Sequence, residues 1–233
     1  MKAFKILFQT ICLLLIIKHS FSWPIPHTGQ TKCYNEITPV PCPKKGEQYY
    51  GQDAQNIVNP RSYTKLDKNG KALPKFSPNW AMVKDNLTDL IWEVKTKTSY
   101  NNSSDKKIFN LDYWIDLVWN EKIKNSPIHD KNTKFTFDEA KNIFIKKLNE
   151  INFGGFSDWR LPNIYELHSI VNYGKWDPAI DQFFFPNTMT DNTMTEFGCY
   201  WTSSALCVCF EMGNDRSKVK ESSLNFVRAV RSE

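Results

Sequence analysis

Apolar residues recur at helical spacing in the segment that begins at Thr136. Thr136 and Glu139 fit the S/T-x-x-E capping box, in which the hydroxyl and the carboxylate bind backbone N–H groups at a helix start. We expect one face of this helix to be buried, and it consists of Phe137, Ala140, Phe144, Leu148 and Ile151. Gly154 and Gly155 follow, and they are expected to end the helix because glycine tolerates the left-handed conformation.

A second helix is predicted directly after Pro162. Asn163 can cap it together with Glu166, and the apolar residues that would face inward are Leu167, Ile170 and Val171. A third amphipathic pattern covers residues 111–122, where Leu, Trp, Ile and Val recur at helical spacing. Its aromatic stripe fits a buried core better than a binding surface.

Short apolar segments on either side of these helices predict β-strands. A strand, a turn at Lys84-Asp85-Asn86 and a second strand are expected over residues 78–93. Three further strands are expected over residues 200–203, 206–211 and 225–231. Strands followed by helices and again by strands predict an α+β domain with a mostly antiparallel sheet.

The first 22 residues have the pattern of a cleavable signal peptide. Lys2 and Lys5 precede an apolar run over residues 6–17, and small residues at Ser20 and Ser22 suit a signal peptidase. The apolar run is shorter than the roughly 20 residues that cross a bilayer as a helix. We therefore expect export to the periplasm, the outer surface or the medium, without a transmembrane anchor.

Removal of the signal peptide changes the charge of the chain. It takes away Lys2, Lys5 and Lys18 and no acidic residue, which lowers the net charge from +5 to +2. The basic composition is therefore weak evidence for a polyanionic partner, and no nucleic acid is expected. Residues 23–75 are rich in Pro, Gly, Asn and Lys and predict an irregular N-terminal arm, while residues 76–233 predict a single domain.

Five cysteines remain after the signal peptide, and in an oxidising compartment they predict disulfides. The turn-rich segment between Cys33 and Cys42 favours that pair. Cys199 could pair with Cys207 or with Cys209 across a short hairpin, which leaves at least one cysteine without a partner inside the chain. No metal site is expected, because the chain has only four histidines and one of them lies in the signal peptide.

The segment from Gly154 to Pro162 reads GGFSDWRLP and is followed by Glu166 and Leu167. It resembles the G-[YF]-S-D-W-R-L-P-x-x-x-E-L signature of the Legionella collagen-like protein C-terminal domain family. Further segments resemble the family in its order, and they are residues 28–34, 50–53, 83–92, 128–131, 135–137, 178–181, 185–186, 200–204 and 227–231. The joint order of these segments makes the resemblance specific.

The chain departs from the family pattern at three places. Asp89 stands where the family usually has glycine in the strand turn, residues 100–126 look like an insertion, and the hairpin after Trp201 is short. Each departure could remodel a binding surface while leaving the core intact.

The R-L-P-x-x-x-E pattern is also similar to one in formylglycine-generating enzymes, which have a C-type-lectin-like fold. The resemblance therefore implies a variant of that fold, with short antiparallel strands and two or three helices. Asp158 and Glu166 are both close enough in sequence to pair with Arg160. Together with Pro162 they form the predicted structural motif, in which a buried ion pair would hold the loop against the helix.

The resemblance and the signal peptide imply an exported, non-enzymatic binding or adhesion module. Its ligand would be a carbohydrate, a glycosaminoglycan or another protein at a surface. The chain has no Gly-X-Y repeat, so the trimeric display of family members with collagen-like stalks does not carry over, and the oligomeric state stays open. The candidate binding residues are Trp159, Arg160, Trp201, Arg228 and Arg231. A place in the core is nevertheless the favoured interpretation of the two tryptophans, and for Arg160 a structural pairing with Glu166 is favoured over ligand binding.

Two other functions are weighed against binding. An oxidase of the formylglycine-generating type would need a copper-binding cysteine pair, and Cys207 and Cys209 supply thiols at a spacing that does not match. A structural protein of the cell envelope would need no small ligand. The Glu-Pro-Asn and Trp-Asn-Asp motifs of calcium-dependent lectins are absent, so calcium has no motif to support it and no cofactor is expected.

Overall fold

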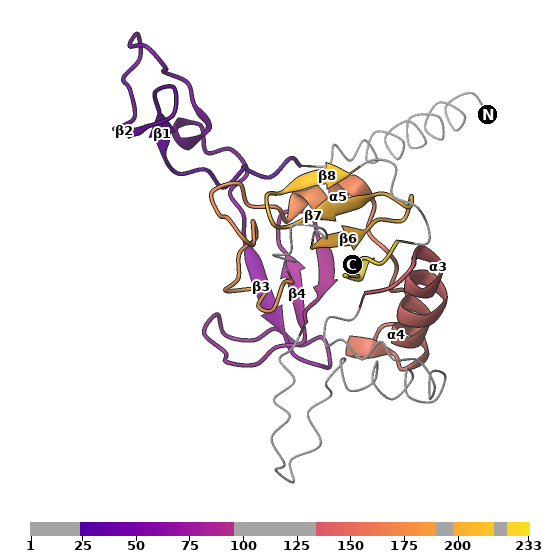
Figure 1. Cartoon of the computed structure of the whole chain (residues 1–233). Coiled ribbons are helices and arrows are strands. Elements are labelled where there is room, and N and C mark those ends of the chain that lie inside the picture. Colours follow the sequence, from indigo (N-terminus) through magenta and orange to yellow (C-terminus); the bar gives the residue numbers. More distant parts are fainter. Residues whose placement is uncertain (1–23, 96–133, 190–197, 217–222) are drawn as a thin grey trace, which may run out of the picture.

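The computed structural model describes residues 24–95, 134–189, 198–216 and 223–233 (Figure 1). Within these residues all strands lie in antiparallel sheets, and one main helix is accompanied by shorter helical turns. The α+β class is therefore confirmed. The predicted signal peptide, the helix expected over residues 111–122 and the insertion at 100–126 lie outside the described residues.

Three sheets organise the described chain, and all of their strands are short. The four-stranded sheet has the order β3 (Tyr63–Leu66), β4 (Met82–Asp85), β5 (Leu90–Glu93) and β9 (Val230–Ser232). The three-stranded sheet consists of β6 (Cys199–Trp201), β7 (Cys207–Cys209) and β8 (Asn214–Arg216), and the third pairs β1 (Cys33–Tyr34) with β2 (Pro39–Val40). In Figure 1 the β1–β2 pair projects away from the other two sheets.

The main helix is continuous and is built from α3 (Phe137–Glu139), the π-helical segment η2 (Ala140–Ile145) and α4 (Lys146–Glu150). A second helix, α5 (Ile164–Ser169), follows, and the single turns η1 (Asp53–Gln55) and η3 (Phe153–Gly155) are 3₁₀-helical. None of the helices in the described part of the chain combines the length and the apolar composition that crossing a bilayer requires.

The four-stranded sheet is covered on both faces, because its residues alternate between two apolar clusters. In β5, Leu90 and Trp92 join a cluster that includes residues of α5 and the three-stranded sheet. Ile91 joins the other cluster, which includes the buried face of the main helix. Figure 1 shows the main helix to one side of the sheet and α5 with β6–β8 at its upper end.

Both predicted capping boxes are present. The Thr136 hydroxyl accepts a hydrogen bond from the Glu139 N–H, and the Glu139 carboxylate accepts one from the Thr136 N–H. Asn163 and Glu166 form the same reciprocal pair at the start of α5. The start of each helix was therefore correctly predicted from residues only three positions apart.

The end of the main helix differs from the prediction. The helix stops at Glu150, and the left-handed residue is Asn152, with φ of 49°. Gly154 serves packing in addition to its positive φ of 69°, since an added Cβ would lie 2.4 Å from the Met82 sulfur. Glycine at this position thus lets the segment approach β4 closely.

The expectation of an irregular segment over residues 23–75 is wrong for its last part. Residues 63–66 form β3, which pairs with β4 in the register Leu66 opposite Met82. The strand has only four residues and no clear alternation, so its sequence gives little signal. It is stabilised by its neighbour in the sheet rather than by its own pattern.

The C-terminal strands also differ in extent from the expected ones. The strand expected over 225–231 is regular only in β9, while Asn225 and Phe226 make single bridges to Phe135 and Tyr200. The strand β8 was not expected at all. The turn between β4 and β5 contains Asp89 with φ of 56°, a left-handed conformation that aspartate tolerates better than most residues do.

Two disulfides join four of the five cysteines among the described residues. Cys33 and Cys42 are bonded, as predicted. Cys199 is bonded to Cys209, which selects one of the two partners that the sequence left open. Cys207 belongs to neither disulfide.

Candidate functional site

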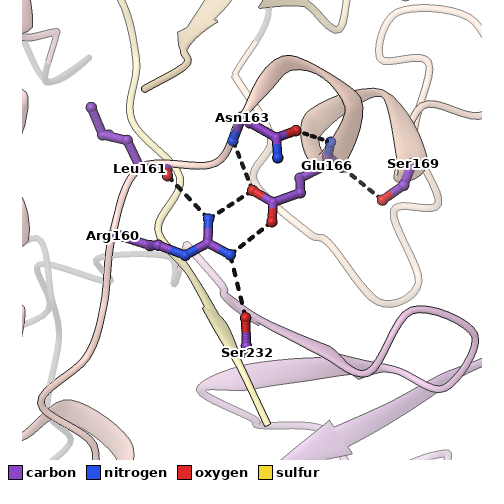
Figure 2. Close-up of polar contacts among 6 residues, drawn as sticks. All are labelled: Arg160, Leu161, Asn163, Glu166, Ser169 and Ser232. Atoms are coloured by element: carbon purple, nitrogen blue, oxygen red, sulfur yellow. Dashed lines mark hydrogen bonds and ion pairs between the residues drawn. The ribbon is translucent and has the colours of Figure 1, made fainter. Parts of the chain in front are cut away.

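The predicted structural motif forms a closed polar network around Arg160 (Figure 2). Its guanidinium donates to both carboxylate oxygens of Glu166, at 2.7 Å each. The same carboxylate accepts from the Asn163 N–H at 2.7 Å, so Glu166 joins the ion pair to the helix cap. Arg160 also contacts the Leu161 carbonyl and the Ser232 hydroxyl at 3.4 Å. We refer to Arg160, Asn163, Glu166 and Ser232 as the Arg160 network.

The Arg160 network fastens the loop before α5 to the C-terminal strand. Backbone hydrogen bonds run in both directions between Arg160 and Val230, at 2.9 and 3.0 Å. Glu166 is buried, and its hydrogen bonds raise the pKa of the half-exposed Arg160 guanidinium. A two-point arginine–carboxylate pair of this kind fixes geometry as well as charge. The contacts therefore support a structural role for both residues.

The pairing of Asp158 differs from the expectation. Its carboxylate accepts from the Arg231 guanidinium at 2.7 and 3.2 Å, rather than from Arg160. The Arg231 side chain also stacks on Phe156, with the guanidinium carbon 3.9 Å from the ring centre. This pair lies at the surface, and the hydrogen bond from Arg231 is the main cause of the lowered pKa of Asp158.

Three of the five candidate binding residues, Trp159, Trp201 and Arg228, are buried. Trp159 donates its indole N–H to the Phe153 carbonyl at 2.9 Å, and Trp201 donates to the Phe135 carbonyl at 2.6 Å. Both rings lie in the same apolar cluster. The alternative of a place in the core therefore fits these tryptophans.

Arg228 is the third buried candidate, with 0% of its surface exposed. Its guanidinium donates to the Glu93 carbonyl at 3.2 Å and to the Thr188 hydroxyl at 2.9 Å. It also lies 5.2 Å from the centre of the Phe185 ring. A buried charge needs such partners, and here they hold the cation inside the protein rather than at a ligand surface. Of the five candidates, only Arg160 and Arg231 reach the surface, and each is already paired.

A different group of side chains forms an open aromatic surface that the sequence did not point to. Phe76 is 81% exposed and Phe183 is 40% exposed, and their ring centres lie 5.9 Å apart. Phe183 packs edge-on against Phe184, which continues into the core. Trp80 is partly buried and donates its indole N–H to the Phe184 carbonyl at 2.8 Å. We call Phe76, Trp80 and Phe183 the aromatic surface.

Lys65 on β3 contacts two of the three rings of the aromatic surface, those of Trp80 and Phe183. Its side chain is almost completely buried, and its ammonium group lies 3.4 Å from the centre of the Trp80 ring and 4.1 Å from that of Phe183. The ammonium donates to the Ser77 carbonyl at 3.1 Å, and burial lowers its pKa. Cation–π contacts of this kind orient both rings. The triple phenylalanine at 183–185 was the one sequence signal that could have drawn attention here.

Cys199, Cys207 and Cys209 form a group of three potential metal ligands among the residues that the structure describes. Two of them are joined in a disulfide, which removes their thiolates as ligands in this state. The ring of His27 contacts backbone groups of Gly29 and Asp53, so a structural role is sufficient for it.

Comparison with known families matches residues 81–231 of the chain to the model of the Lcl C-terminal domain. The match covers more than half of the chain and includes three members of the Arg160 network, Arg160, Asn163 and Glu166. No curated protein and no solved structure matched the chain.

Proposed function

The chain belongs to the Lcl C-terminal domain family, and from this premise we propose that it is an exported, non-enzymatic binding or adhesion module. Its ligand is a carbohydrate or glycosaminoglycan at a surface, and the fold is a C-type-lectin-like variant. Two disulfides support export, because such bonds persist in oxidising compartments.

The observation that carries the proposal is the aromatic surface. Single exposed apolar residues are common, but Phe76 and Phe183 lie together, and Phe183 is in turn held by a cation–π contact with the buried Lys65. Sugar rings present a face of C–H groups that packs on an aromatic ring, and the ring side chains lose little conformational entropy on binding. This surface thus replaces the buried tryptophans as the proposed contact region.

The Arg160 network supports the same proposal in a different way. Its charged groups are satisfied within the protein, so the network holds the loop and the C-terminal strand instead of offering a reactive group. The copper oxidase alternative loses support as well, since Cys209 is bonded to Cys199 in this state. The expected absence of enzymatic activity remains a proposal.

A glycan and glycosaminoglycan array with the purified exported protein, with and without calcium, tests the proposal. We expect retention on one class of glycan without a calcium requirement, and loss of retention in the double variant Phe76→Ala, Phe183→Ala. The matched control is Tyr165→Ala, because Tyr165 is 79% exposed but lies on α5. Absence of binding to every glycan would contradict the carbohydrate proposal. Equal binding by both variants would show that the ligand contacts a part of the protein other than the aromatic surface.

A further inference from the structure

The β1–β2 pair belongs to a small folded unit that projects away from the two larger sheets (Figure 1). We call this unit, residues 31–56, the outer arm. The first disulfide closes a loop within it, and the Gln52 side chain exchanges two hydrogen bonds with the Tyr34 backbone, at 2.7 and 2.8 Å. The outer arm therefore has its own internal connections, and its position depends on how it is fastened to the rest of the chain.

The two segments that flank the outer arm, residues 25–30 and 57–61, are fastened to the domain, and we call them the base. The Thr28 carbonyl accepts a hydrogen bond from the Tyr173 N–H at 2.8 Å, in the loop after α5. The Arg61 guanidinium donates to two backbone carbonyls at the end of α5. The base is thus held by the domain, and movement of the outer arm would occur relative to the base.

The ring of His27 joins the base to the outer arm. Its Nδ1 lies 3.0 Å from the backbone nitrogen of Gly29 in the base, and its Nε2 lies 3.1 Å from the carbonyl oxygen of Asp53 in η1, 26 positions along the chain. The amide N–H of Gly29 can only donate, so Nδ1 must be the unprotonated acceptor. The carbonyl can only accept, so Nε2 must carry the proton. The two partners therefore assign the neutral Nε2–H tautomer to this histidine.

We propose that His27 is a proton-operated latch that holds the outer arm on the base and releases it in acid. A proton added to Nδ1 would face the Gly29 N–H, and two donors cannot form a hydrogen bond. The ring cannot turn Nδ1 away without also moving Nε2 from the Asp53 carbonyl, because both nitrogens are engaged. Histidine ordinarily changes its charge between about pH 5 and 8, and this ring is only partly buried. The latch therefore holds at the upper end of this interval and is lost as pH falls through it.

Other charged groups lie on the segments around His27. They are Asp53 of η1, Arg61 of the base and, in the loop after α5 and on α5 itself, Lys175 and His168. Carboxylate, lysine and arginine side chains ordinarily keep their charge between about pH 5.5 and 7.5. His168, whose Nδ1 lies 3.5 Å from the Tyr173 hydroxyl, is therefore the second group beside the base that could respond to acid in this interval.

Nuclear magnetic resonance of the ¹⁵N-labelled exported protein tests the latch. At about pH 7.5 the ring nitrogens of His27 should report the Nε2–H tautomer. On acidification to about pH 5.5, protection of the Gly29 amide against hydrogen exchange, corrected for the intrinsic effect of pH, should fall about fivefold, as for loss of one ordinary hydrogen bond. The backbone order parameters of the outer arm should fall over the same interval. A proton on Nδ1 at the higher pH, or unchanged protection and order parameters, would overturn the proposal.

Two matched variants separate His27 from its neighbour. In His27→Asn the side-chain oxygen can accept from the amide two residues on and does not titrate, so we expect protection of Gly29 to be independent of pH. In His168→Gln we expect the fivefold fall to remain. A fall of the same size in His27→Asn, or its loss in His168→Gln, would place the acid response outside His27 and contradict the latch. Should His27→Asn fail to fold, the tautomer and the exchange of the unaltered protein decide.

Discussion

The Arg160 network and the aromatic surface both place a cation among several partners, but they use it in opposite ways. In the network Arg160 and Glu166 satisfy each other, and the helix cap takes up the remaining lone pair. At the aromatic surface Lys65 contacts the inner sides of Trp80 and Phe183 and leaves Phe76 open to solvent. A closed arrangement serves the fold, while an open one is available to a ligand.

Removal of the charge of Glu166 should have the largest effect. Glu166→Gln leaves Arg160 without a counter-charge and weakens the cap of α5, so we expect a loss of about 3 kcal/mol in the free energy of unfolding. This is the lower end for a broken buried pair, because the Arg160 side chain is partly exposed. Urea denaturation measures the loss. A variant that unfolds at the same urea concentration as the unaltered protein would show that the network is not structural.

High pH should act next most strongly, through Tyr63, whose ring packs against Phe184 and Phe185. Burial raises the pKa of Tyr63 to about 12 from an ordinary value of 10.0. Between these values the unfolded chain loses the phenol proton and the folded protein keeps it, so stability falls as pH rises from 10 to 12, by up to about 2 kcal/mol. If Tyr63 is the cause, the unaltered protein should lose stability relative to Tyr63→Phe by about 2 kcal/mol over this interval. Parallel curves would contradict it.

The surface pair of Asp158 and Arg231 should matter less than the Arg160 network. We expect Asp158→Asn to cost about 0.5–1 kcal/mol, since the carboxylate is well exposed. The pKa of Asp158 is lowered below its ordinary 3.8, chiefly by the hydrogen bond from Arg231, so its contribution is present above that pH and is lost as pH falls through the lower folded value. The difference between the two proteins in thermal unfolding should therefore shrink from pH 5 to pH 2. A constant difference would argue for packing instead of charge.

Phe76→Ala should change stability least of all. Its ring is 81% exposed, so we expect the free energy of unfolding to stay within about 0.5 kcal/mol of the original value. Urea denaturation of Phe76→Ala alongside Glu166→Gln would sharpen the contrast between an open and a closed arrangement. A loss of several kcal/mol for Phe76→Ala would mean that the aromatic surface is part of the core and unavailable to a ligand.

Features that depend on neighbours in sequence were predictable. The caps at Thr136 and Asn163 and the pair of Arg160 with Glu166 all join residues at most six positions apart. The Cys33–Cys42 disulfide likewise joins residues that are close in sequence, nine positions apart. In such cases the chain has few alternatives, because short segments allow only a small set of conformations.

Features that depend on register between distant segments were not predictable from the pattern. The sequence pointed to Arg160 as the partner of Asp158, and the pairing with Arg231 follows from the position of β9 beside the loop. Phe76 and Phe183 are far apart in sequence, and Lys65 of β3 contacts both segments that carry them, through the Ser77 carbonyl and the Phe183 ring. Burial of Trp159, Trp201 and Arg228 likewise required the two clusters to assemble around the sheet.

The sequence by itself therefore determined the helix starts, the α+β class, the first disulfide and the family of this protein. Only the tertiary structure decided the partner of Cys199, the second arginine pair and the aromatic surface. The physical reason is that caps and short loops are stabilised by local hydrogen bonds, whereas strand register is selected by apolar burial summed over the whole sheet.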